Sequence, residues 1–263
     1  MQRLAHIRNL IIDMDGVLYR DNDPMPGLVE FFHFLQQRGV HYLLATNNST
    51  RTPAQYVEKM ASMGVQITPA DLITSAQATA AYLREIAPPG TPVYAIGQAG
   101  LRAALQEAGF ALEEGCAELV VAGMDVDLTY EKLKTATLLI RRGATFIGTN
   151  PDVTLPTPQG FAPGTGAILA AIQAATGVAP RVIGKPEPTM FQQAMARLGA
   201  TPADTAALGD RLETDILAAQ RTGVLSLLVL SGATDRALLA GSSIQPDLVF
   251  EDIADLQGNW ARL

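Results

Sequence analysis

Short apolar runs alternate with longer helical patterns along the whole chain, and this alternation limits the folds open to it more than any other feature. The runs have the length and composition of buried strands; they are Leu10–Ile12, Tyr42–Ala45, Val93–Ile96, Leu119–Ala122, Thr145–Ile147, Val182–Ile183, Ala206–Leu208 and Leu225–Leu230. Helices are expected between them, with capping signals clearest for Leu28–Gln37, residues 52–64 and Tyr130–Arg141. Such alternation predicts βαβ units, a mostly parallel sheet and the α/β fold class.

Composition excludes several other classes of protein. Hydrophobic residues make up 48% of the 263 residues and charged residues 17%, so the chain can bury a substantial core. Acidic residues outnumber basic ones by 26 to 19, which argues against nucleic-acid and anionic membrane partners. No secretory segment is visible, and no apolar run approaches the ~20 residues that span a bilayer. The expectation is a soluble cytoplasmic protein.

The single cysteine, Cys116, rules out an intrachain disulfide. It is expected to pack as a small apolar residue. A thiol nucleophile would need a base, and none of the three histidines lies near it in sequence.

Polar side chains follow several of the expected strands, where ligands bind in open parallel sheets. Asp13 and Asp15 follow the first strand, and Gly16 allows a sharp turn. Two carboxylates so close repel unless a cation joins them or one is protonated, so one can act as nucleophile and the other as acid. The alternative is that both merely initiate a turn.

Three further segments have the same placement. Thr46 to Ser49 offer neutral donors for a phosphate oxygen, or else form an ordinary loop and cap. Lys185 can balance the carboxylates and attract an anion, or lie solvated on the surface. Asp210 can reach Mg²⁺, and Asp215 can lie near the metal or, like Glu213, favour a helix N-terminus.

Together these segments resemble the four motifs of the haloacid dehalogenase (HAD) superfamily. The resemblance extends to the 4-nitrophenylphosphatase or NagD-like branch through Asp13–Leu18, Thr46–Asn48, Thr149–Asp152, Pro163–Gly166, Gly184–Pro188 and Gly209–Asp215. It covers nearly the whole chain, and no motif position departs from the pattern.

This resemblance implies a Rossmann-like parallel-sheet HAD core with an inserted smaller α/β cap domain of class IIA. Only a loop fits between Asp15 and the next helix, whereas 139 positions separate Thr46 from Lys185, enough for a compact domain. The core is expected at residues 1–83 and 181–263, and the cap at residues 84–180. A homodimer formed through the cap is a further expectation.

The resemblance also assigns roles. Asp13 is the nucleophile that becomes phosphorylated, and Asp15 protonates the leaving group and then activates water. The phosphoryl group binds to Thr46, Asn47 and Lys185. Mg²⁺ is held by Asp13, the backbone carbonyl of Asp15 and Asp210, with Asp215 in support. The expected function is Mg²⁺-dependent hydrolysis of small phosphomonoesters, such as a sugar phosphate, a nucleotide, phosphoglycolate or, in vitro, 4-nitrophenyl phosphate.

Substrate-reading residues are expected in the cap, by similarity to cap loops of the family; the candidates are Asp125, Asp127, Asn150 and Asp152. Residues 163–166 have the glycines of a phosphate loop without the rest of its pattern, so they are interpreted as a turn opening a helix at Ala167–Thr176.

Other classes of protein share parts of this pattern. A phosphoacceptor signalling module also uses Asp, Thr and Lys, but lacks the large insert and the acid two residues after the nucleophile. A phosphotransferase or mutase of the same superfamily would differ by transferring the phosphoryl group to an added alcohol rather than to water.

Overall fold

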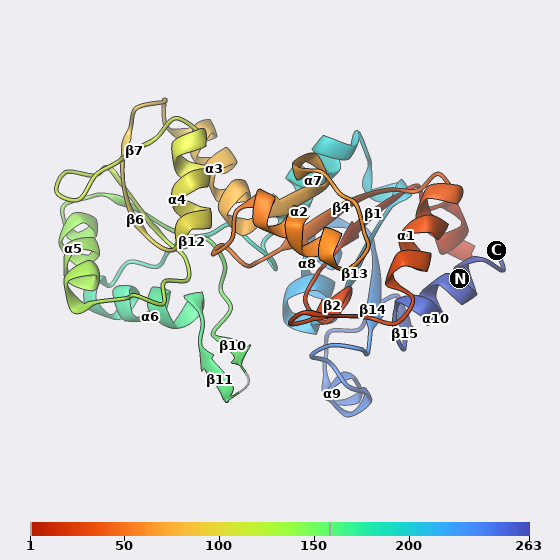
Figure 1. Ribbon diagram of the computed structural model, residues 1–263. Helices are drawn as coiled ribbons and strands as arrows, with labels where there is room; N and C mark the ends of the chain where they lie inside the picture. The colour runs from red at the N-terminus through yellow and green to blue at the C-terminus, as the bar shows by residue number, and fades with distance from the viewer. Residues whose placement is uncertain (1, 158) are drawn as a thin grey trace. The chain divides into compact units, whose positions relative to one another are not determined.

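The computed structural model describes residues 2–157 and 159–263, which form two compact units (Figure 1). The first unit comprises the chain up to Thr46, then Ala54–Ile73 and Lys185–Leu263. The second comprises Asn47–Pro53 and Thr74–Gly184. The chain therefore crosses between the units four times.

The first unit is built on a six-stranded sheet with the order β15-β14-β13-β1-β4-β5. Its strands are β1 (Asn9–Ile12), β4 (His41–Thr46), β5 (Leu72–Thr74), β13 (Thr205–Gly209), β14 (Leu225–Val229) and β15 (Leu248–Phe250). The pairs that β1 forms with β13 and β4 are parallel, as are those that β14 forms with β13 and β15. The carboxyl ends of β1, β4 and β13 consequently lie at one edge of the sheet.

Helices cover both faces of this sheet. Its α-helices are α1 (Leu28–Gln37), α2 (Pro53–Ser62), α7 (Pro188–Leu198), α8 (Leu217–Thr222), α9 (Arg236–Gly241) and α10 (Ile253–Trp260). Leu10 and Ile12 share a core cluster with side chains of α1 and α10, and those two helices pack together. Because side chains alternate along a strand, Ile11 faces the other side, where α7 packs on β1 and β4.

Short elements complete the first unit: the 3₁₀ turns η1 (Gln2–His6), η2 (Pro69–Asp71) and η3 (Pro202–Asp204), the π-helical turn η4 (Leu212–Ile216), and the hairpin of β2 (Tyr19–Arg20) and β3 (Asp23–Pro24).

The second unit has its own five-stranded sheet with the order β12-β9-β8-β6-β7, parallel throughout. The strands are β6 (Pro92–Ile96), β7 (Ala111–Leu112), β8 (Leu119–Ala122), β9 (Thr145–Gly148) and β12 (Arg181–Val182). One face packs on α5 (Tyr130–Arg141) and α6 (Thr165–Thr176) through a shared apolar cluster. The helices α3 (Ser75–Ile86) and α4 (Ala99–Glu107) pack on each other, and β10 (Thr154–Thr157) pairs with β11 (Gly160–Pro163) as a hairpin.

The α/β class is confirmed, and each expected strand has its counterpart within one or two residues. The short strands β5, β7 and β15 were not predicted. The compact units also differ from the expected domain bounds, because α3 packs on α4 and so joins the second unit instead of the first.

One expectation about side-chain burial is wrong. Cys116 is exposed, because it lies in the polar turn between β7 and β8 and not in a strand or helix. Within the described residues, no helix has the length and apolar character needed to cross a membrane.

Leu10→Ala should destabilise the first unit by about 2–5 kcal/mol, because Leu10 is fully buried in the central strand β1 and its loss leaves a cavity. Urea unfolding followed by circular dichroism measures this change. Leu238→Ala, at a half-exposed position of α9, is the matched control and should leave the unfolding midpoint nearly unchanged. Equal midpoints for the two variants would contradict the placement of Leu10.

Candidate active site

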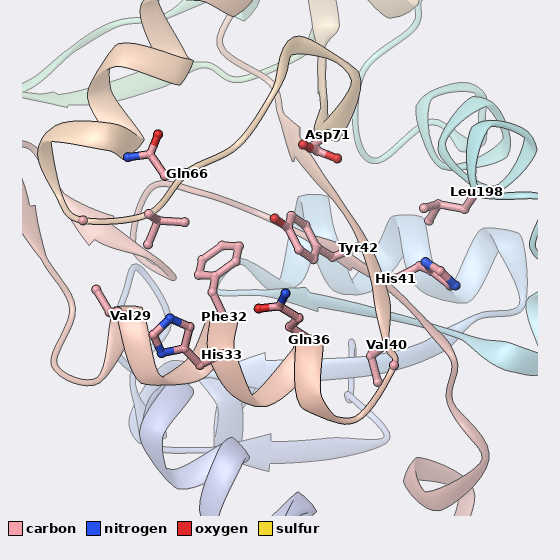
Figure 2. A pocket seen from close by; sticks show the side chains of 13 residues that line it. Val29, Phe32, His33, Gln36, Val40, His41, Tyr42, Gln66, Asp71 and Leu198 are labelled. Atoms are coloured by element: carbon pink, nitrogen blue, oxygen red, sulfur yellow. The ribbon is translucent and has the colours of Figure 1, made fainter.

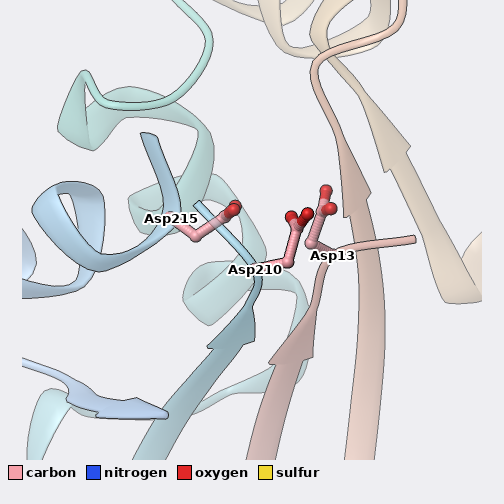
Figure 3. Close-up of side chains that lie close together, drawn as sticks. All are labelled: Asp13, Asp210 and Asp215. Carbon is pink, nitrogen blue, oxygen red and sulfur yellow. The ribbon is translucent and has the colours of Figure 1, made fainter. Parts of the chain in front are cut away.

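Three carboxylates meet at the carboxyl edge of the first unit's sheet. Asp13 directly follows β1, Asp210 follows β13, and Asp215 lies in the turn η4 just beyond (Figure 3). Each offers an oxygen within 4.8 Å of the oxygens of the other two. The parallel pairing of β1 with β13 brings Asp13 and Asp210 together, as the sequence predicted for strand ends.

Lys185 lies between two of these carboxylates and is 2% exposed. Its Nζ donates hydrogen bonds to Asp13 Oδ1 at 2.5 Å, to Asp215 Oδ1 at 2.7 Å and to the Ala45 carbonyl at 3.0 Å. Lys185 thus pairs with two carboxylates inside the protein and does not lie solvated on the surface. Residue 185 is also the first residue of the first unit after the chain leaves the second.

Burial and repulsion from neighbouring carboxylates disfavour the ionised forms of Asp13 and Asp210. Burial raises the pKa of Asp13 well above its ordinary value, and Asp215 and Asp210 add to this, although Lys185 opposes it. Burial and the neighbouring Asp215 raise the pKa of Asp210 to about 7. Burial alone would lower the pKa of Lys185, but Asp13 and Asp215 outweigh it, so this pKa lies above its ordinary value. The cluster thus contains one charged lysine and three acidic side chains.

Both carboxylate oxygens of Asp215 accept hydrogen bonds from other groups of the protein. Besides Lys185 at Oδ1, Asp215 Oδ2 accepts from the backbone N–H of Arg211 at 3.2 Å and from Thr214 Oγ1 at 3.4 Å. Asp215 is therefore an anchor for Lys185, near the other carboxylates but less available to a metal. Glu213, in the same turn, is exposed.

A hard cation fits the remaining oxygens. Asp210 Oδ2 accepts the backbone N–H of Ala233 at 2.6 Å, whereas the buried Oδ1 accepts no hydrogen bond from any described residue. A buried acceptor without a donor is costly unless a cation or water satisfies it. The three carboxylates exceed the ammonium by two negative charges when all are ionised, and an all-oxygen donor set suits a divalent cation such as Mg²⁺.

The remaining residues expected in the first unit lie at the same edge. Asp15 is exposed, and its backbone forms an isolated bridge with Tyr19. Gly16 makes the turn between them with φ of +84°. Thr46 is the buried last residue of β4, the strand next to β1.

Asn47, expected to bind phosphate with Thr46, belongs by its contacts to the second unit. Its Nδ2 donates to both carboxylate oxygens of Asp152 at 3.2 Å, and its carbonyl accepts from Asn150 Nδ2 at 2.8 Å and from Ser75 Oγ at 2.6 Å. Asn47, Asn150 and Asp152 thus form one network within that unit.

Asp125 and Asp127 lie in the loop after β8, where their surroundings differ. Asp125 is buried; it pairs with Lys132 at 2.7 Å and accepts from the Asp127 backbone N–H and from Gln98. Asp127 is exposed. The sequence analysis missed both partners, because Lys132 lies within the helix α5 and Gln98, two residues after β6, is uncharged and matches no motif.

Residues 163–166 behave as a turn. The helix α6 begins at Thr165 after the cap residue Gly164, two positions before the expected start. A Cβ on Gly164 would lie 2.3 Å from the Asp152 carbonyl, so glycine is needed there for close packing of the loop.

A hollow of about 660 Å³ lies at the opposite edge of the first unit's sheet, where β4 begins with His41 (Figure 2). His33 and Gln36 from α1 line it and, like His41, are exposed. The buried, charged cluster at the carboxyl edge is therefore the better candidate for chemistry.

Comparisons with known proteins agree with this geometry. Residues 10–111 match a family model described as haloacid dehalogenase-like hydrolase, and residues 182–256 match one described as HAD-hydrolase-like. An acid sugar phosphatase of Staphylococcus aureus strain MRSA252 is 41% identical over 244 residues, which cover 92% of this chain and 94% of that protein.

Solved structures of similar proteins extend the likeness to the whole fold. The 4-nitrophenylphosphatase of Thermotoga maritima has a TM-score of 0.94 and 34% identity, covering 97% of this chain and 98% of that one. NagD of E. coli K-12 has a TM-score of 0.87 and 33% identity, covering 95% and 98%.

Lys185→Met should lower the free energy of unfolding by about 3–5 kcal/mol, because it leaves two buried carboxylates without their cation. Urea unfolding at neutral pH without divalent ions measures the loss. Lys134→Met is the control, since Lys134 pairs with Glu131 on the exposed surface of α5, and it should unfold like the wild type. A Lys185→Met protein as stable as the wild type would show that the buried pairs are not needed.

Proposed function

The chain belongs to the haloacid dehalogenase-like hydrolases and is a phosphatase, and from this we propose that it is a Mg²⁺-dependent phosphomonoester hydrolase that works through an aspartyl-phosphate on Asp13. The single observation that carries the proposal is the position of Asp13. Its side chain is 12% exposed, is held by Lys185 and lies beside Asp210, which has an unsatisfied oxygen.

In the first step, a carboxylate oxygen of Asp13 attacks phosphorus in line with the leaving oxygen. The bond from phosphorus to the leaving oxygen breaks, and Asp15 donates its proton to that oxygen, so the alcohol departs neutral. The exposure of Asp15, two residues from Asp13, supports this role because the acid must reach a substrate arriving from solvent.

In the second step, water attacks the phosphorus of the aspartyl-phosphate. Asp15, now a carboxylate, takes a proton from the water, and the bond between phosphorus and Asp13 breaks. Inorganic phosphate leaves, and both aspartates return to their starting states. In this proposal Thr46, Asn47 and Lys185 bind the phosphoryl oxygens through hydrogen bonds and positive charge.

The proposed ligands of Mg²⁺ are Asp13, the Asp15 backbone carbonyl and Asp210, with Asp215 in support. Bound there, Mg²⁺ supplies positive charge that neutralises the phosphoryl oxygens and the attacking carboxylate. Both oxygens of Asp215 already accept hydrogen bonds from the protein, which is consistent with a secondary part for Asp215 in binding the metal.

We propose that the domain expected at residues 84–180, which lies within the second unit, acts as a cap that selects the leaving group. Asp125, Asp127, Asn150 and Asp152 remain the candidates, and the exposed Asp127 is best placed to meet a substrate because Asp125 is committed to Lys132. The acid sugar phosphatase of S. aureus supports a hydroxyl-rich phosphomonoester as the substrate class. A homodimer formed through this unit stays a prediction.

Hydrolysis of 4-nitrophenyl phosphate should stop on removal of divalent cations by EDTA and return with added Mg²⁺. The physical reason is the excess negative charge at Asp13, Asp210 and Asp215, which repels a phosphate dianion. Release of 4-nitrophenol measures the rate. Full activity after exhaustive chelation would refute the metal requirement.

Asp13→Asn should abolish turnover with little change in melting temperature, because an amide does not act as the nucleophile. Asp15→Asn should differ, since 4-nitrophenolate leaves without an acid: it should release one equivalent of 4-nitrophenol in a burst and retain a phosphoryl group detectable by intact mass. The pair of variants therefore separates the two steps. Steady turnover by Asp13→Asn would remove the central residue from the mechanism.

A further inference from the structure

The loop that follows β14, residues Ser231 to Thr234, surrounds the carboxylate of Asp210. The backbone N–H of Ala233 donates to Asp210 Oδ2 at 2.6 Å, and the backbone N–H of Thr234 donates to the Asp210 carbonyl at 3.1 Å. These bonds fix both the main chain and one carboxylate oxygen of Asp210. Its other oxygen, Oδ1, accepts nothing from the described part of the chain.

Two glycines enclose the same carboxylate. A Cβ on Gly232 would lie 2.0 Å from Asp210 Oδ2 and 2.5 Å from its Cγ, and a Cβ on Gly16 would lie 2.4 Å from Oδ2. The φ of Gly232 lies outside the left-handed region, so its backbone conformation does not require glycine. What requires glycine at 232 is the space taken by the Asp210 side chain.

The loop also holds the turn that carries Asp15. Ser231 Oγ donates to the Gly16 carbonyl at 2.8 Å, and Arg20 Nε donates to the Ser231 carbonyl at 3.0 Å. The segment after Asp15 and the segment after β14 are thereby joined through side chains. Ser231 thus fixes the residue next to the backbone carbonyl proposed as a metal ligand.

We propose that Ser231 to Thr234 form a positioning loop for the metal site, with Gly232 as its critical residue. The loop holds Asp210 Oδ2 and so presents Oδ1 alone to the cation, and it keeps the Asp15 turn beside it. A carboxylate held in one orientation binds without first losing rotational freedom, which favours the bound state. This inference rests on the proposed function, because it needs Asp210 to be a metal ligand.

The test compares Gly232→Ala with Gly241→Ala, the same substitution at a position where a Cβ would meet no described atom within 4 Å. Two quantities are measured: the Mg²⁺ concentration that half-saturates 4-nitrophenyl phosphate hydrolysis, and the Kd of Mn²⁺ for the metal-free protein by electron paramagnetic resonance without substrate. Gly232→Ala should weaken both by about 10- to 100-fold, while kcat at saturating Mg²⁺ stays within about threefold. Gly241→Ala should match the wild type in both.

Ser231→Ala provides a second variant in case Gly232→Ala does not fold by circular dichroism. It removes one hydrogen bond to the Asp15 turn and should weaken Mn²⁺ binding by about two- to tenfold. Unchanged Mn²⁺ affinity in folded Gly232→Ala, or in Ser231→Ala where the former is unfolded, overturns the proposal, as does a loss of kcat alone. Full wild-type activity in EDTA would contradict the proposed function itself, which is a different result from a metal-dependent wild type with unaltered variants.

Discussion

The carboxyl edge of the first unit's sheet depends on the contacts of the buried Lys185 ammonium. Its three donors are satisfied by Asp13 after β1, by Asp215 in η4 and by the carbonyl of Ala45 in β4. Three chain segments that are distant in sequence are thus joined at one charged atom. The cost of burying a cation is offset by two carboxylates in direct contact, so the ammonium is not left uncompensated.

This arrangement gives three similar carboxylates different tasks. Both oxygens of Asp215 accept hydrogen bonds from the protein, and Asp215 thereby holds Lys185 in place. Asp210 is held through Oδ2, and in the proposed mechanism its unsatisfied Oδ1 binds the cation. Asp13 is partly exposed and paired with Lys185, and in the same proposal it attacks the substrate. Environment, not residue type, separates the three aspartates: burial and the neighbouring Asp215 raise the pKa of Asp210.

Much of the fold and of the candidate site could be predicted from the sequence, because each buried parallel strand is marked by a short run of apolar residues. Apolar runs and capping residues placed α1 and α5 to the residue, and the rule that ligands gather at strand carboxyl ends led to Asp13, Lys185 and Asp210. The rest depends on contacts that no residue pattern in the sequence marks. The commitment of Asp125 to Lys132 and the packing of α3 on α4 have no local signature. The loop that begins at Ser231 does follow a predicted strand. However, it contacts Asp210 through a backbone N–H group and through a glycine that leaves room for the carboxylate, and a search for charged residues overlooks both.

The stereochemical course at phosphorus tests the central claim most directly. Two successive in-line displacements, first by Asp13 and then by water, each invert the configuration and together retain it. The measurement is hydrolysis of a phosphomonoester made chiral at phosphorus with oxygen isotopes, in isotopically labelled water, followed by analysis of the phosphate formed. Net retention is the result expected for an aspartyl-phosphate on Asp13. Net inversion would mean that water attacks the substrate directly, and it would contradict the account.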